Sequence, residues 1–511
     1  MSITRHHDGV RVVFYPPAGG GTRLSAPVVA AGRDEPPCPV VSASFDKAMG
    51  QGFSGTAQIS LRWTPGLESR YRGQTWLDLV KPGDWFLLDA VQSGYQHVVT
   101  VGIVGTITER FMVADGAPFS VYAVSARDLG CTLDDTEIWF NEVGRAGLAA
   151  GAAMFGLLNK EAGTPHELCA ALAKGFLSPE QTALYGGVTA GGGVWRVPES
   201  ARTLFQIRVH NPSVVNVIDF DSHMGRTRGL ANILQQLFGT TYNLGSLLRD
   251  WGHTALNEVF YDLRSADPRG TKLTPALVVR ERPFPVFGET LGAWDRLPVA
   301  RVPRSALLTG SSLSLSGAER YNAFVLIAAS DALNATGQTL YNPPLFMPDS
   351  VARYGLRKME VTSRFAAVAS VDGYSQELGR WLWLLASWYS ANASMLSGSL
   401  SLRGFFPALR IGRRLRLGGL PDGSPTEQVD AYVESVGVRW APIVGWTADV
   451  GVTRGLRGTT SWQGLLAESW KDVQYLVEHQ LRAVKTDPFL PPPDFVPYSD
   501  DVDTSLGGGL L

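Results

Sequence analysis

The sequence has few cysteines and almost no net charge. Its 511 residues include three cysteines, Cys38, Cys131 and Cys169, at unrelated spacings and without a CxxC unit. This pattern indicates neither a disulfide framework nor a zinc knuckle, and it predicts synthesis in a reducing cytoplasm. With 45 basic and 47 acidic residues, the chain has no cationic excess for phosphate-backbone binding. We therefore expect no specific nucleic-acid binding.

Long uninterrupted apolar runs are also lacking. Residues 146–159 are uncharged but too few to cross a bilayer. Residues 381–402 are numerous enough, but serine and asparagine residues interrupt them, so we interpret this run as a buried helix followed by a strand. The first residues lack an apolar signal core with a small-residue cleavage site. We expect no membrane span and no secretory signal.

Sequence signatures of catalysis are missing as well. No GxSxG, HExxH, P-loop or GxGxxG motif occurs in a usable context, and the glycine runs 191–193 and 507–509 lack an accompanying strand–helix unit. We expect a protein that is not an enzyme, with no catalytic residue, no cofactor and no bound metal.

What the sequence does contain is turn formers and large apolar side chains. There are 56 glycines, 31 prolines and 14 tryptophans, and 45% of the residues are hydrophobic. A chain of this length is expected to form two to four domains. Residues 1–130 predict antiparallel β-structure, because Ala57, Ile59, Leu61 and Trp63 alternate with polar residues. The expected strands here are 10–14, 56–63, 85–91, 97–107 and 119–126.

Residues 131–275 predict a helical or mixed insertion. Short helices are expected at 146–158, 165–176 and 179–184. A longer helix is expected at 244–260, followed by a strand at 275–282. The longer helix is inferred from one apolar stripe at spacings of three and four, formed by Leu244, Leu247, Leu248, Trp251, Ala255 and Val259.

Residues 276–465 predict a second β-region with an embedded helix at 378–395. Its expected strands are 323–328, 400–402, 415–417, 432–438 and 447–454. Residues 466–511 predict an amphipathic helix, starting at about 465, and an extended C-terminal arm that carries Asp500, Asp501 and Asp503. The expected fold class is α+β, with two small tube-like antiparallel β-barrels, in residues 1–130 and 276–465.

An internal similarity links the two β-regions. Residues 83–88, 101–105 and 121–130 have the same order of features as residues 412–417, 433–437 and 450–458: a glycine turn, a strand, a valine-containing strand, and a strand ending in arginine and glycine. This similarity predicts a duplicated barrel. Two unrelated small barrels with generic turn chemistry are the alternative.

Several short motifs resemble one known family. They are 257–264 (NEVFYDLR), taken as the end of a helix, 275–284 (PALVVRERPF), 124–135 (VSARDLGCTLDD), and the segments 412–417, 432–436 and 452–455. In this combination the chain resembles the baseplate hub proteins of phage tails and related contractile injection systems. The resemblance covers most of residues 40–460.

The resemblance implies a structural role in the virion tail. Hub proteins carry two tube-like barrels and form homotrimers, so that six barrels form a pseudo-sixfold ring between the sixfold tail tube and the threefold spike. The implied partners are the tail tube, tape measure, spike or tip, and peripheral baseplate proteins, with assembly in the host cytoplasm. A hub with an embedded cell-wall hydrolase, and a receptor- or carbohydrate-binding tail tip, are the alternatives.

Three groups of residues could carry chemistry. Asp219, Asp221 and His223 share one face of a strand and could bind a cation, although a polar strand face explains them better. An acidic group could serve glycoside hydrolysis, but a solvated turn is the preferred interpretation; its members are Asp134, Asp135 and Glu137. Cys131 lacks the local signature of a thiol nucleophile and is expected to be a buried small residue.

Other conspicuous side chains have structural interpretations. We expect core or interface positions for the helix-spaced aromatic residues, which are Trp251, Trp381, Trp383 and Trp388. His253 is expected to be a satisfied polar group. Arg280 and Arg282 alternate with apolar and acidic neighbours, so we expect both to be exposed, toward a ring lumen or a partner.

Overall fold

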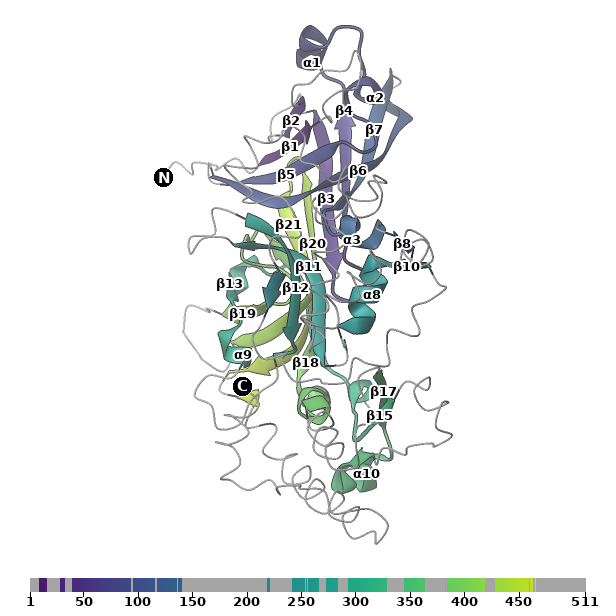
Figure 1. Ribbon diagram of the computed structural model, residues 1–511. Coiled ribbons are helices and arrows are strands. Elements are labelled where there is room, and N and C mark those ends of the chain that lie inside the picture. Colours follow the sequence, from purple (N-terminus) through teal and green to yellow (C-terminus); the bar gives the residue numbers. More distant parts are fainter. Residues whose placement is uncertain are drawn as a thin grey trace.

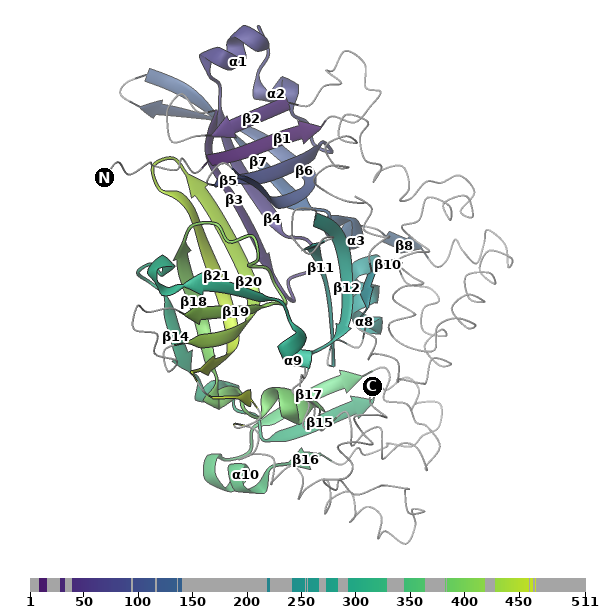
Figure 2. The ribbon, with the colours of Figure 1, turned by 90° about the vertical axis from the view of Figure 1, so that its left-hand side faces the viewer.

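The computed structural model describes residues 9–15, 28–32, 39–92, 95–114, 117–135, 137–139, 218–220, 241–252, 254, 256–265, 273–283, 293–328, 344–363, 382, 384–418, 428–458, 460–462 and 465. Its described elements form an elongated arrangement, with the N-terminal β-region at one end and a small sheet near the other (Figures 1 and 2).

The N-terminal β-region contains seven described strands, which are the five expected from the sequence and two more. In β4 (Thr56–Arg62), Ala57, Ile59 and Leu61 are buried, whereas Thr56 and Gln58 are exposed. The other strands are β1 (Gly9–Tyr15), β2 (Val28–Gly32), β3 (Val40–Ala48), β5 (Trp85–Gln92), β6 (Tyr95–Ala114) and β7 (Ala117–Asp128). Short helices α1 (Pro65–Arg70), α2 (Trp76–Leu79) and α3 (Cys131–Asp135) accompany them.

Four strands of the C-terminal β-region match predicted strands and extend beyond the expected ends: β18 (Leu396–Arg403), β19 (Arg414–Gly418), β20 (Val429–Ala441) and β21 (Gly445–Arg457). Two more strands, β13 (Val299–Pro303) and β14 (Ser312–Leu315), were not expected from the sequence. α9 (Ala293–Arg296) and the 3-10 turns η5 (Arg304–Ala306), η6 (Gly317–Glu319) and η8 (Asn392–Ser394) connect or flank them. Helical residues at 382 and 384–389 confirm part of the embedded helix.

Smaller sheets complete the described structure. β11 (Asn257–Ser265) pairs with β12 (Leu273–Glu281), which also pairs with β9 (Ile218–Phe220), and β8 (Glu137–Trp139) pairs with β10 (Thr241–Asn243). β15 (Ala323–Ala328) lies between β16 (Leu345–Phe346) and β17 (Lys358–Ser363), next to α10 (Pro348–Tyr354). The expected helices at 146–158, 165–176 and 179–184 and the tail 488–511 lie outside the described residues, as does most of 465–484.

One expected element is wrong. The helix expected at 244–260 ends much earlier, because α8 spans only Leu244–Trp251. The Gly252 amide closes it on the Leu248 carbonyl, and the Asn257 side chain then donates to the Gly252 carbonyl. Residues 257–264, taken as a helix end, belong to strand β11. The apolar residue Val259 of β11 continued the helical spacing only by coincidence.

The two β-regions are not separate sheets. Hydrogen bonds join thirteen described strands into one sheet, with the path β14-β18-β21-β20-β3-β4-β7-β6-β5-β1-β2 and the branch β20-β19-β13. Residues 435–440 of β20 pair antiparallel with residues 43–48 of β3. We call this pairing the joint. The described path does not close on itself, so the two expected tube-like barrels stay a prediction.

The sheet contains the predicted internal repeat. The order β3-β4-β7-β6-β5 in the first repeat matches β14-β18-β21-β20-β19 in the second, with antiparallel neighbours throughout. Gly83, at φ +89°, donates to the Val104 carbonyl at 2.8 Å, and Gly412, at φ +70°, donates to the Val433 carbonyl at 2.9 Å. A register shift follows each of these valines.

The strand geometry corrects one detail of the sequence comparison. Val104, rather than Val101, is the counterpart of Val433, so the middle strands align three residues away from the sequence pattern. With this alignment the register shift places Thr106 opposite Ser125 and Ser435 opposite Gly451. The repeat is therefore visible as a hydrogen-bond pattern.

Candidate functional site: the joint between the repeats and its buried ion pairs

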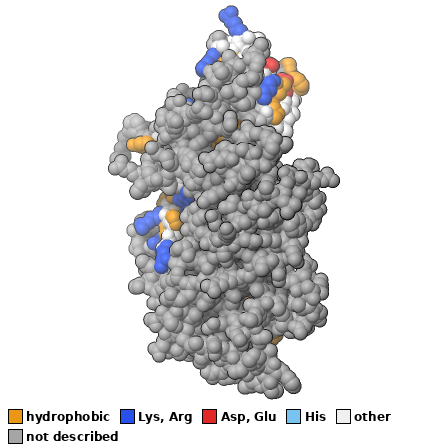
Figure 3. All heavy atoms as spheres, viewed as in Figure 1, with side chains coloured by type: hydrophobic (Ala, Val, Ile, Leu, Met, Phe, Trp, Pro, Cys, Tyr) orange, Lys and Arg blue, Asp and Glu red, His pale blue; other side chains and the backbone are white. Residues whose placement is uncertain are grey.

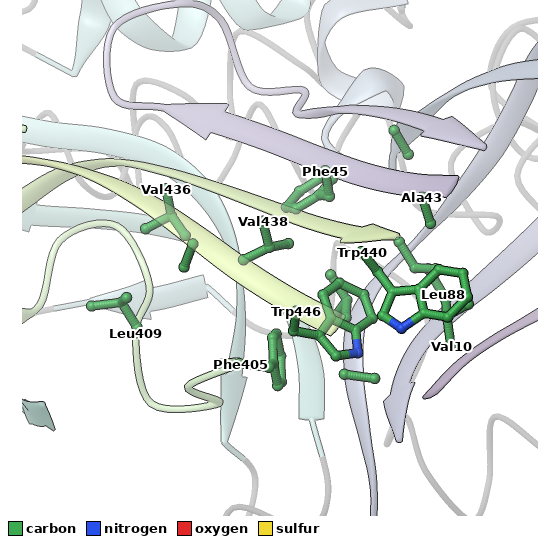
Figure 4. Close-up of a cluster of buried hydrophobic side chains, with 14 of the residues drawn as sticks. Val10, Ala43, Phe45, Leu88, Phe405, Leu409, Val436, Val438, Trp440 and Trp446 are labelled. Atoms are coloured by element: carbon green, nitrogen blue, oxygen red, sulfur yellow. The ribbon is translucent and has the colours of Figure 1, made fainter. Parts of the chain in front are cut away.

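The joint is anchored by two tryptophans of the β20–β21 hairpin. Trp440 and Trp446 pair across this hairpin, and each is 1% exposed. Figure 4 shows them among side chains of both repeats, including Leu88 and Phe405. The Trp446 indole donates to the Gly9 carbonyl of β1 at 2.8 Å. Burial of two such large side chains makes the joint a major source of stability.

Two strand edges that correspond to the two sides of the joint have no described strand opposite them, one in β6 and one in β14. In β20, residues 429–432 pair with β19, and residues 435–440 pair with β3 on the same edge. In β6, residues 95–103 pair with β5, but residues 106–111 have no described strand opposite that edge. Among the described strands, β14, the first strand of the path, pairs only with β18.

Exposed apolar side chains accompany these open edges. Leu315 of β14 is 60% exposed, and Phe111 of β6 is 82% exposed. Met112, Val113 and Phe119 extend the apolar surface at the end of the β6–β7 hairpin. Figure 3 shows hydrophobic side chains gathered at this end of the molecule. Apolar surface beside an unpaired strand edge is typical of a protein interface.

A buried ionic network connects β11 and β12 to the second repeat. Arg280 of β12 donates to Glu258 of β11 at 2.9 Å, to the Gly412 carbonyl at 2.7 Å and to the Tyr432 hydroxyl at 3.2 Å. Tyr432 in turn donates to Glu258 at 2.6 Å. Burial and the neighbouring Glu258 raise the pKa of Tyr432 above its ordinary value. Every member is thus held by at least two partners.

A second buried pair lies within the first repeat. The Lys47 ammonium group contacts the Asp128 carboxylate, donates to the Phe53 carbonyl at 2.8 Å and lies 4.4 Å from the Tyr261 ring centroid. Burial raises the pKa of Asp128 to about 6, although Lys47 and two backbone amides lower it. Lys47 therefore connects β3 and β7 to β11.

This raised pKa predicts a pH dependence of stability. The folded protein binds the Asp128 proton more tightly than the unfolded chain does. The contribution of this proton to folding stability is therefore present below pH 3.8 and is lost as the pH rises through about 6. The difference between the two pKa values corresponds to about 3 kcal/mol of folding free energy. We expect the stability of the wild type relative to D128N to fall between pH 4 and pH 7. Thermal unfolding across this range checks it, and a constant or rising difference would contradict it.

The structure places the predicted site residues in structural roles. Asp134 accepts from the Phe53 amide at 3.1 Å and from the Ser54 amide at 2.9 Å, and Asp135 pairs with Arg127. Asp135 is exposed but lies in helix α3 and not in a turn, whereas Asp134 is half-buried and fastens a loop. Cys131 is buried, as expected, and burial raises the pKa of its thiol to about 12. The side chain of Glu137 lies outside the described residues.

The expectation for Arg280 is wrong. It is 6% exposed and therefore lines neither a lumen nor a partner surface, because the second repeat covers the face of β12 that alternation alone suggested was open. Arg282 is half-buried, donates to the Thr254 carbonyl at 2.9 Å and lies 6.0 Å from the Trp388 ring.

The core interpretation of Trp388 is confirmed. Its side chain is fully buried, with the Arg454 guanidinium 3.9 Å from the ring centroid and the Tyr432 ring edge-on at 5.9 Å. The side chains of Trp251, Trp381 and Trp383, and residue His253, lie outside the described residues. So does the Asp219, Asp221 and His223 group, of which only the backbone of residue 219 is described, within β9.

The sequence pattern did not identify four residues of the joint and its ion pairs: Lys47, Glu258, Tyr432 and Trp440. Lys47 carried a signal, because it lies in an alternating strand on the same face as Ala43 and Phe45. In the part of the chain that the structure describes, no group of three or more potential ligands could hold a metal ion. No described helix is long and apolar enough to cross a membrane.

Comparison with known proteins finds likeness only among solved structures. No family model and no curated protein matches the sequence. The 43 kDa tail protein of prophage MuSo2 from Shewanella oneidensis has a TM-score of 0.40 at 11% identity, over 89% of this chain and all of that one. A tail protein from Neisseria meningitidis has a TM-score of 0.38 at 10% identity, over 88% of this chain and 96% of that one.

A third similar structure comes from a secretion complex. The Francisella PdpA–VgrG complex has a TM-score of 0.39 at 9% identity, over 90% of this chain and 55% of the matched chain. Likenesses at this level of TM-score and identity do not establish the function of this chain. The structural neighbours of the chain are phage tail proteins and VgrG complexes, the class of protein that its sequence motifs resemble.

Proposed function

We propose that the chain is a structural ring subunit of a phage-type tail, the baseplate hub, and that it acts through assembly rather than catalysis. The observation that carries this proposal is the repeated strand order, with an open edge in β6 and another in β14 at the positions that correspond to the joint. The joint already shows how the edge of one repeat accepts the next repeat. The same pairing between copies, from β6 of one copy to β14 of the next, would continue the sheet around a closed ring.

The internal repeat specifies the register of this second joint. Counted from the register shifts, Thr108 is the counterpart of Gly437, which pairs with Asp46. Ser314 is the counterpart of Asp46, because Leu313 and Phe45 lie opposite equivalent residues of β18 and β4. Thr108 would therefore lie opposite Ser314 of the next copy, and Ile107 opposite Leu315.

Phe111 would anchor this joint. It lies six residues beyond Gly105, as Trp440 lies six residues beyond Glu434, at the corresponding register shift. Trp440 is buried within the chain, whereas Phe111 is 82% exposed. A neighbouring copy that covers Phe111 would remove the exposed apolar surface at this edge.

The proposed ring would adapt one symmetry to another. Three copies with two repeats each would present six similar strand units, which suits a sixfold tail tube on one face and a threefold spike on the other. The tape measure and peripheral baseplate proteins would be further partners, and the ring would lie in the virion tail after assembly in the host cytoplasm. The roles of Asp134, Asp135 and Cys131 in the fold support a non-enzymatic function.

A pair of engineered cysteines tests the second joint. In the variant T108C/S314C, we expect disulfide bonds between copies under mild oxidation, with a product of three times 55.2 kDa by light scattering. The control T106C/S314C moves one cysteine two residues out of register and should crosslink much less. Equal crosslinking in both variants, or none in either, would rule out this register.

A further inference from the structure

Four arginines gather where β11 and β12 meet the turn before β19. Arg264 and Arg280 come from these strands, and Arg410 and Arg413 come from the turn. The charges of Arg264, Arg280 and Arg410 all act on Arg413. Two described carboxylates, Glu258 and Asp262, pair with Arg280 and Arg410, and Arg413 has no described carboxylate partner of its own.

The available carboxylates do not satisfy this cluster. Glu258 binds Arg280 and Tyr432, and Asp262 lies 3.5 Å from Arg410 through one oxygen. Arg413 makes one long contact of 3.4 Å, to the Ala408 carbonyl, and forms no ion pair with a described carboxylate. Burial, together with neighbouring arginines, lowers its pKa to about 10.

Leaving Arg264 aside, three buried polar atoms of the cluster lack a hydrogen-bond partner in the described structure. Two are donors, the Nε atoms of Arg410 and Arg413, and one is an acceptor, the Oδ2 atom of Asp262. A buried guanidinium donor without an acceptor is costly, so an anion that accepts from these donors would stabilise the fold. Arg413 is only half-buried, which leaves an approach from solvent.

The repeat shows that the turn itself does not need these arginines. Asp84 is the counterpart of Arg413 in the first repeat, where its carboxylate accepts from the Lys81 amide at 2.8 Å and closes its own turn. Both turns make the same two backbone hydrogen bonds to a valine, which is Val104 of β6 in the first repeat and Val433 of β20 in the second. The side chain of Arg413 is therefore available for another role.

We propose that this cluster binds one protonated oxyanion, inorganic phosphate or a phosphomonoester. Its unprotonated oxygens accept from the Nε–H groups of Arg410 and Arg413, as guanidinium groups commonly bind phosphate. Its hydroxyl group donates to the Oδ2 atom of Asp262. Sulfate has the same shape and a similar charge, but at neutral pH it has no proton to donate. The site therefore selects phosphate over sulfate.

The test compares phosphate with sulfate on the full-length chain. Calorimetric titration and thermal unfolding are measured at equal ionic strength. Because both anions stabilise proteins through general exclusion, the difference between the effects of phosphate and sulfate reports specific binding. We expect phosphate to bind and sulfate to fail. O-phosphoserine as a third probe shows whether a monoester binds as free phosphate does. Equal effects of phosphate and sulfate on the wild type would overturn the proposal.

Variants separate the site from a general charge effect. R413Q is expected to weaken phosphate binding about tenfold or more, the loss of one charge-assisted hydrogen bond. R403Q, at an exposed arginine outside the cluster, should bind phosphate as the wild type does. If R413Q does not fold, R413K keeps the charge, lacks the Nε–H group and should also bind weakly. D262N should lose the preference for phosphate over sulfate. Unchanged binding in the folded Arg413 variants would sink the proposal.

Discussion

Replacing Arg280 with methionine is expected to lower the stability of the fold by about 3–5 kcal/mol, the usual cost of removing one partner from a buried ion pair. The substitution leaves the Glu258 carboxylate buried, with Tyr432 as its remaining partner, and frees the Gly412 carbonyl. A large drop in the midpoint of thermal unfolding would record this loss.

Two further variants make the Arg280 result specific. E258Q/R280M removes the charge left behind, so it should be more stable than the sum of its single substitutions predicts. R416M breaks an ion pair to Asp430 in which Arg416 is 37% exposed, and should cost no more than about 1 kcal/mol. If R280M and R416M had similar effects, the buried network would not hold the repeats to β11 and β12.

Exchanging Phe111 for serine is expected to abolish ring assembly without destabilising the isolated chain. An exposed side chain contributes little to the stability of the monomer, about 0.5 kcal/mol or less. Its counterpart Trp440 is buried within the chain, so W440A should cost about 3–5 kcal/mol. Light scattering would report the assembly state, and thermal unfolding the stability.

The pair of variants distinguishes two explanations of the exposed apolar hairpin. If Phe111 is an interface anchor, F111S changes the mass and W440A changes the unfolding temperature. An F111S variant that still forms rings would show that the β6–β7 hairpin does not join the copies. A W440A variant as stable as the wild type would show that the two positions are not equivalent.

Much of the strand content could be predicted because it depends on local alternation. β4 and β21 bury every second residue along much of their length, and this pattern is visible in the sequence itself. The helix end at Trp251 was missed because apolar residues continue at helical spacing beyond Gly252. Local spacing cannot distinguish a long helix from a short helix followed by a strand that is buried on both faces.

The joint and the ionic network could not be predicted, because they depend on contacts between distant parts of the chain. Nothing in the pattern of β3 or β20 alone specifies that the two strands pair or in which register. Arg280 alternates like an exposed residue, but the Gly412 carbonyl and Tyr432 of the second repeat contact its side chain. Burial of this kind is a property of packing between elements.

The pairing of β3 with β20 has a consequence for synthesis. β3 leaves the ribosome about 390 residues before the segment that covers its edge, an interval of roughly 20–80 s at ordinary elongation rates. During that time Ala43 and Phe45 are uncovered, and β20 of a chain completed earlier could occupy the edge first. Newly made chains therefore need protection from one another, and crowded synthesis on one messenger would favour exchanged joints over correctly closed ones.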